Sequence, residues 1–194
     1  MKIKHLFSFL IVISSLNLLA VNAAETKWSI DGDSAKNDLG KKIFRYIGNA
    51  RFENDLYLIK GDTLEAFQSR DVEKRYVKVK GAPATLIRKT QQEGRLELTA
   101  KTISYHAKSQ QLSSNEEVVL SLKNNDGTIK LQGNNLQVGD GAKGKIFVEG
   151  TPSQLILNQS DSGITATALR IEFDQATQIL TLLGDIELKT ERES

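Results

Sequence analysis

The same alternation of apolar and polar residues recurs along the chain, and this repetition constrains the fold more than any other feature. Segments 98–122 and 164–190 match each other, with the same seven-residue interval from Tyr105 to Leu112 as from Phe173 to Leu180. Alternation with period two is typical of a β-strand with one buried face. A unit of roughly thirty such residues has to stack on neighbouring units to bury its apolar face. We therefore expect one continuous, all-β structure.

A second pair of matching segments carries the turn residues. Both segments contain a Gly-Asp/Asn-x-Leu turn, at Gly61 to Leu64 and Gly133 to Leu136. Both also place a proline in Gly-x-Pro, at Gly81 to Pro83 and Gly150 to Pro152. Asp126-Gly127 separates two alternating runs and predicts a tight hairpin, because glycine readily adopts positive φ. No long segment keeps a 3.6-residue apolar period, so we expect little helix beyond one short turn around residues 33–38.

The first 23 residues have the layout of a secretory signal peptide. Lys2 and Lys4 precede an apolar run from Leu6 to Leu19, and Val21-Asn22-Ala23 provides a small-residue cleavage site. We therefore expect residues 1–23 to be removed and residues 24–194 to form a single domain. An uncleaved membrane anchor is the alternative, but serines and an asparagine interrupt the apolar run, which is short for a span of about 20 apolar residues.

Charge and cysteine content exclude several classes of protein. Removal of the two N-terminal lysines leaves 24 basic residues against 24 acidic ones. A neutral chain with interspersed charges lacks the basic surface that nucleic-acid binding needs, so we expect no nucleic-acid partner. The chain has no cysteine, which excludes disulfides, thiol catalysis and thiolate metal sites.

No set of side chains has the spacing of an enzyme site. The processed chain keeps one histidine, His106, which we expect on the surface at a strand end. Carboxylate pairs such as Glu116-Glu117 fall where adjacent residues of a strand point to opposite faces. The glycine-rich segment 139–145 lacks the spacing of a phosphate-binding loop. We therefore predict that the protein is not an enzyme and holds no cofactor or metal.

Several segments together resemble the LptA family, the OstA-like periplasmic proteins of lipopolysaccharide transport. The resemblance covers nearly all of the mature chain and is carried by WSIDGDSAKN (28–37), YIGNARF (46–52), IKGDTLEAF (59–67), KGAPATL (80–86) and LTAKTISYHAKSQQL (98–112). The chain departs from the family pattern in two places. LSSNEEVVL (112–120) replaces the usual Leu-x-Gly-Asn turn, and 164–190 adds a final repeat unit.

The resemblance implies an open β-jelly roll, a V-shaped stack of antiparallel strands, whose apolar interior shields the acyl chains of lipid A in the periplasm. It implies an LptC-type inner-membrane partner at the N-terminal edge. At the C-terminal edge it implies an LptD-type outer-membrane partner or another copy, giving a head-to-tail homo-oligomer. We expect the free edges near residues 27–31 and 185–190. The residues expected to contact lipid are Trp28, Ile30, Phe44, Tyr46, Tyr57, Ile59, Leu64, Leu86, Ile103 and Tyr105.

Two other functions fit the same sequence. An LptC-type subunit of the same transport system would keep the first segment as a membrane helix, and the N-terminus of the mature protein distinguishes it. A secreted β-solenoid acting as an adhesin or carbohydrate binder would carry polar and aromatic groups on its outer face and would not respond to lipid.

Overall fold

A computed structural model describes residues 28–71, 74–88, 95–124, 127–139, 145–159, 162–174, 176–177 and 179–192. The predicted signal peptide lies outside these ranges, as do residues 140–144 of the glycine-rich segment. Within the described part of the chain, no helix has the length and apolar character needed to cross a bilayer.

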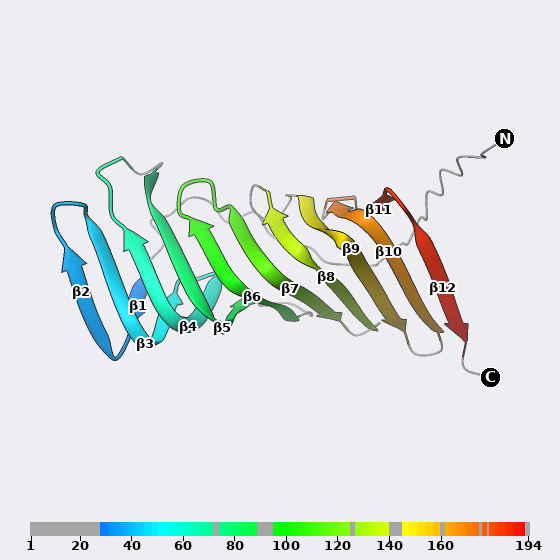
Figure 1. Ribbon diagram of the computed structural model, residues 1–194, viewed down its shortest axis with the longest axis horizontal. Coiled ribbons are helices and arrows are strands. Elements are labelled where there is room, and N and C mark those ends of the chain that lie inside the picture. The colour runs from blue at the N-terminus through cyan, green and yellow to red at the C-terminus, as the bar shows by residue number, and fades with distance from the viewer. Residues whose placement is uncertain are drawn as a thin grey trace.

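The described residues form one antiparallel sheet, in agreement with the all-β prediction (Figure 1). The hydrogen-bonded order is β1-β3-β4-β5-β6-β7-β8-β9-β10-β11, with β2 also on β3 and β12 also on β10. The strands are β1 (Ser29–Asp31), β2 (Ser34–Asp38), β3 (Ile43–Glu53), β4 (Tyr57–Phe67), β5 (Tyr76–Arg88), β6 (Arg95–His106), β7 (Leu112–Asn124), β8 (Gly127–Val138), β9 (Lys145–Gln159), β10 (Ser162–Asp174), β11 (Ile179–Leu183) and β12 (Glu187–Arg192).

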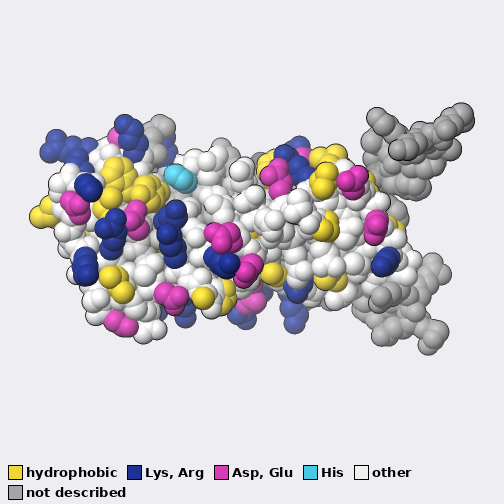
Figure 2. Space-filling view, in the orientation of Figure 1, with side chains coloured by type: hydrophobic (Ala, Val, Ile, Leu, Met, Phe, Trp, Pro, Cys, Tyr) yellow, Lys and Arg dark blue, Asp and Glu magenta, His cyan; other side chains and the backbone are white. Residues whose placement is uncertain are grey.

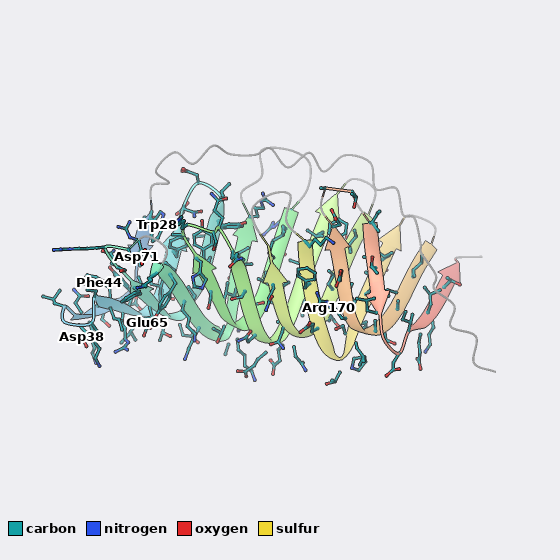
Figure 3. The ribbon with its side chains drawn as sticks, turned by 90° about the horizontal axis from the view of Figure 1, so that it is seen from above. Trp28, Asp38, Phe44, Glu65, Asp71 and Arg170 are labelled. Atoms are coloured by element: carbon teal, nitrogen blue, oxygen red, sulfur yellow. The ribbon has the colours of Figure 1, made fainter. Side chains whose placement is uncertain are left out.

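Every long strand is interrupted near its middle, and the interruptions form one line across the sheet. The pairing register shifts at that line in each pair from β3 to β10. At the two ends of the sheet the break is complete. There β2 and β1 share β3, and β11 and β12 share β10. Extra residues at such bulges bend a strand, and the ribbons in Figure 3 curve accordingly. The sheet therefore folds over itself into two facing layers.

The repeated Gly-Asp/Asn-x-Leu segments lie inside β4 and β8 at this line, so the prediction of turns there was wrong. Their two glycines are required by close packing. A Cβ on Gly61 would lie 2.5 Å from the Lys80 carbonyl oxygen and 2.6 Å from a Val79 methyl carbon. A Cβ on Gly133 would lie 2.7 Å from both the Glu149 carbonyl oxygen and a Val148 methyl carbon. The repeated signature thus marks equivalent contacts between β4 and β5 and between β8 and β9.

Two sequence predictions about local structure have clear outcomes. Residues 34–38, where a short helical turn was expected, form strand β2 instead, so that prediction was wrong. The pairing of β2 with β3 explains the difference, because hydrogen bonds to a long neighbouring strand override weak local preference. The predicted hairpin is confirmed, since β7 and β8 pair up to Asn124 opposite Gly127, while Asp126 of its turn lies outside the described residues.

The outer face of the sheet carries charged side chains and one aromatic row. Arg45 pairs with Glu65 at 3.0 Å, and the Tyr76 hydroxyl donates to the same carboxylate at 2.9 Å. The rings of Phe67 and Tyr76 stack with centroids 5.6 Å apart. Figure 2 shows a hydrophobic patch over β3–β5 with basic side chains around it. The outer surface is thus mixed, in contrast to the inner one.

Candidate functional site

The inner faces of the two layers form a continuous apolar interior along the sheet. In β4, Ile59 is buried on one side of the bend and Leu64 on the other. The same holds in β6 for Leu98 and Ile103. The buried cluster continues as far as Leu180 in β11. An apolar core therefore spans nearly the full length of the sheet.

All ten residues predicted to contact lipid belong to this interior. The register places Ile30 opposite Phe52, Tyr46 opposite Leu64 and Ile59 opposite Leu86, so the predicted residues share the inward-facing positions. The structure thus brings them together on the inner surface, and their contact with lipid stays a prediction.

Exposure divides these ten residues into two groups. Six are buried, with at most 8% of the residue exposed, namely Tyr57, Ile59, Leu64, Leu86, Ile103 and Tyr105. Four are only partly buried and pack against the edge of the core, namely Trp28, Ile30, Phe44 and Tyr46. Figure 3 shows Trp28 and Phe44 at the same end of the sheet, far from Arg170. The interior is thus filled by side chains at its centre and partly open at the end formed by β1, β2 and β3.

Aromatic rings join the two layers near that end. Phe52 lies in the layer that contains β1, and Tyr105 in the layer that contains β2. Their ring centroids are 5.7 Å apart, and Tyr105 also contacts Tyr57 at 5.6 Å. Trp28 packs edge-on against Phe52 at 5.6 Å. This aromatic cluster holds the layers together across the side opposite the bend.

Sequence reasoning missed the second half of the interior. The buried residues of β8 to β10 were not predicted, although the repeat identifies several of them. Leu136 matches Leu64, Leu155 matches Leu86 and Phe173 matches Tyr105, and all three are buried. Assigning each residue of the second repeat the same inward-facing position as its match in the first repeat would have identified them.

Polar groups gather beside the aromatic cluster, at strand ends far from the bend. Arg88 ends β5, is half-buried, and lies opposite Tyr57 in the register. Asn54 is 3% exposed, and its side-chain oxygen accepts the backbone N–H groups of Leu56 at 2.9 Å and Tyr57 at 2.6 Å. The turn between β3 and β4 is therefore fixed by Asn54.

Burial is the main cause of the pKa shifts of the ionisable side chains in this cluster. Burial raises the pKa of Tyr105 to about 12, reinforced by the nearby Tyr57 and opposed by the adjacent Asn54 amide. Burial also raises the pKa of Tyr57, and the charge of Arg88 opposes that shift. Burial lowers the pKa of Arg88. At neutral pH the cluster thus presents a guanidinium and neutral hydroxyl and amide groups.

The residues weighed for catalysis are solvent-exposed. His106 is exposed at the end of β6, as predicted, with its ring 6.1 Å from that of Tyr76. Glu116 and Glu117 were expected on opposite faces, and this was wrong. Both have positive φ at the β7 bulge, and both contact the Lys101 amine, at 3.4 and 3.0 Å. Among the described residues, no group of three His, Cys, Asp or Glu side chains could hold a metal ion.

Comparison with known proteins gives a family match and a distant structural likeness. Residues 29–139 match the model of the LptA/(LptD N-terminal domain) LPS transport protein family. A similar solved structure is that of LptH, the LptA homologous periplasmic component of the conserved lipopolysaccharide transport device from Pseudomonas aeruginosa, with 14% identity and a TM-score of 0.48. That match covers 88% of this chain and 97% of LptH. A search of curated proteins finds no match. Because the family model matches more than half of the chain, this protein belongs to the LptA/LptD N-terminal domain family of lipopolysaccharide transport proteins.

Proposed function

We propose that the protein is a periplasmic bridge component that carries lipopolysaccharide with the acyl chains of lipid A shielded in the apolar interior. The observation that carries this proposal is the continuous row of inward-facing apolar side chains in a sheet that is open at both ends. Acyl chains gain about 0.8 kcal/mol for each CH₂ group removed from water. An elongated apolar interior therefore suits a ligand with acyl chains better than it suits a compact polar ligand.

Lipid enters this interior at the end that is partly open. Phe44 and Tyr46 are partly exposed on the inner surface of β3 and contact acyl chains without any large rearrangement. Ile59 and Leu86 are fully buried, so acyl chains reach them only when the two layers separate. We therefore expect the residues near β1 and β2 to contact lipid first and the central ones later.

Photo-crosslinking tests the lipid path with matched neighbours on one strand. A crosslinker at Tyr46, which faces inward opposite Leu64, should capture lipopolysaccharide. The same crosslinker at Arg45, which is exposed and paired with Glu65 on the outer face, should stay silent. Capture at Arg45 together with silence at Tyr46 contradicts the lipid path.

The unpaired sides of the outermost strands are the proposed docking edges. Within the described residues, β1 and β2 pair only with β3, and β11 and β12 pair only with β10. An open edge is a template for a strand of another chain. We assign the β1 and β2 edge to an LptC-type partner. The β11 and β12 edge receives an LptD-type partner or a second copy, in head-to-tail order.

Exposed apolar residues at the second edge support this assignment. Ile186 is 49% exposed and Leu188 is 45% exposed. The variant Leu188→Asp should keep its fold and lose concentration-dependent association, measured by sedimentation. Lys60→Asp, at an exposed position in a strand that is paired on both sides, is the control and should associate like the wild type. Equal association of Leu188→Asp and wild type contradicts the edge assignment.

The alternative of a membrane-anchored LptC-type subunit shares this fold. Mass spectrometry of the protein isolated from its host separates the two, because cleavage near Ala23 gives a free component and retention of residues 1–23 gives an anchored one.

A further inference from the structure

We propose that Arg88, Tyr57, Tyr105 and Asn54 form a binding site for a phosphate group at the margin of the apolar interior. This proposal rests on the proposed function, and it identifies which part of the lipid is held by polar contacts. The four side chains come from β5, from β4, from β6 and from the turn between β3 and β4.

Contacts between neighbours bring the four residues together. Tyr57 lies opposite Arg88 in the register of β4 and β5. The Tyr57 ring lies 5.6 Å from the Tyr105 ring in the facing layer. Asn54 accepts the Tyr57 N–H through its side-chain oxygen and lies beside the Tyr105 hydroxyl. The cluster therefore spans both layers at the side opposite the bend.

The cluster has donors in excess of acceptors. Tyr57 is 8% exposed, Tyr105 is 2% exposed and Asn54 is 3% exposed. The Asn54 side-chain nitrogen is buried and lies beside the Tyr105 hydroxyl without the geometry of a full hydrogen bond, and no other described group accepts from it. A buried donor without an acceptor costs about 1–3 kcal/mol. An incoming acceptor at this position removes that cost.

Arg88 supplies the positive charge. Burial and Tyr57 are the causes of its pKa shift, and no carboxylate of the described chain contributes to it. A half-buried guanidinium next to hydroxyl and amide donors is suited to a phosphate, which accepts several hydrogen bonds at once. The arginines on the outer face differ, because Arg45 and Arg170 each pair with glutamates.

The location favours a phosphate that is attached to acyl chains. Leu86 precedes Arg88 by two residues on the same inward-facing row and is fully buried. Two residues of a strand span about 7 Å. A molecule with a phosphate at the margin and acyl chains farther in therefore contacts both the cluster and the apolar interior.

The test compares Arg88→Gln with Arg95→Gln in the full mature protein. Arg95 is the matched control because it begins the next strand, is exposed and pairs with Glu97. Binding is measured for lipopolysaccharide, for the same lipid with its phosphates removed, and for inorganic phosphate. We expect Arg88→Gln to weaken binding of the phosphorylated lipid about 10- to 100-fold, as for a lost charge-assisted hydrogen bond. Arg95→Gln should bind like the wild type.

The other ligands separate the possible results. Loss of the phosphates should weaken wild-type binding and abolish the difference between wild type and Arg88→Gln. If Arg88→Gln loses affinity equally for the phosphorylated and the dephosphorylated lipid, the proposal is overturned, because the substitution then disturbs the interior as a whole. Unchanged binding of the phosphorylated lipid also overturns it. Arg88→Lys keeps the charge and should recover part of the affinity, which a purely structural role of the side chain does not predict.

Inorganic phosphate separates this site from the lipid function as a whole. If wild type binds phosphate, Arg88→Gln does not, and neither binds lipid, the proposed transport function fails while the anion site stands. If phosphate binding depends on Arg88 but lipid binding does not, the site serves free phosphate and the assignment to the lipid is wrong.

Discussion

Substitution of the repeated glycine in β4, Gly61→Ala, tests the packing at the bend of the sheet. The new Cβ would lie 2.5 Å from the Lys80 carbonyl oxygen and 2.6 Å from a Val79 methyl carbon. One of these neighbours belongs to the backbone of β5, so it has little freedom to move away. The strands β4 and β5 therefore have to shift apart at the bend.

The magnitude follows from the cost of overpacking. Inserting one carbon into a well-packed position costs typically about 1–3 kcal/mol. For a domain of this size, each kcal/mol lowers the melting temperature by roughly 2–4 °C. We therefore expect Gly61→Ala to melt roughly 2–12 °C below the wild type. Gly133→Ala should behave similarly, because its Cβ would meet the Glu149 carbonyl oxygen at 2.7 Å.

Thermal unfolding followed by circular dichroism measures the effect, and Gly40→Ala is the control. A Cβ on Gly40 would meet only the Asp38 side-chain oxygen, at 3.5 Å, which is an ordinary contact. Alanine at an unstrained glycine position commonly raises stability by about 0.4–1 kcal/mol. If Gly61→Ala and Gly40→Ala have the same midpoint of unfolding, the repeated glycine is not required by packing, and our explanation of the repeat is wrong.

Three further predictions concern single buried side chains. The native pKa of Tyr105 is raised to about 12, so the unfolded chain releases the hydroxyl proton at a lower pH than the folded chain does. The free energy of unfolding of the wild type should therefore fall between about pH 10 and pH 12, by at most about 3 kcal/mol. Tyr105→Phe should show a smaller fall in urea titrations, and an equal fall contradicts the cause. Ser153 is fully buried and donates to the Val148 and Leu169 carbonyl oxygens, so Ser153→Ala should lower the free energy of unfolding by about 0.5–1.5 kcal/mol, and unchanged stability argues against these bonds. Ile59→Asp places a carboxylate at a fully buried position and should lower the free energy of unfolding by several kcal/mol. The control Lys60→Asp changes an exposed neighbour and should alter that free energy by under about 0.5 kcal/mol in the same assay.

The strand content and the need for neighbouring units to stack follow from the sequence because they depend on local patterns. Period-two alternation predicts strands with one buried face wherever Val, Ile, Leu and aromatic residues alternate with polar ones. The Gly-Asp/Asn-x-Leu and Gly-x-Pro signatures recur in corresponding strands, β4 with β8 and β5 with β9. The exposed position of His106 was also predictable, because it follows the last inward-facing residue of its strand.

The inward-facing residues on both sides of the bend could not be assigned from alternation alone. Ile59 and Leu64 lie five positions apart, and this odd spacing would place them on opposite faces of a regular strand, yet both are buried. The bulge at Gly61-Asp62 changes the phase, and only pairing with β3 and β5 locates it. The same reason explains Glu116 and Glu117, whose positive φ directs both side chains to Lys101.

The contacts between layers are decided by tertiary structure. Phe52 and Tyr105 are more than fifty residues apart in sequence, and they meet because the sheet folds at a line where every long strand shifts register. The polar cluster around Arg88 depends on the same fold, since its members lie on separate strands and share no sequence motif. Local alternation determines that each strand has an inner face. The position of the bend, which depends on pairing between strands, determines which inner residues face each other.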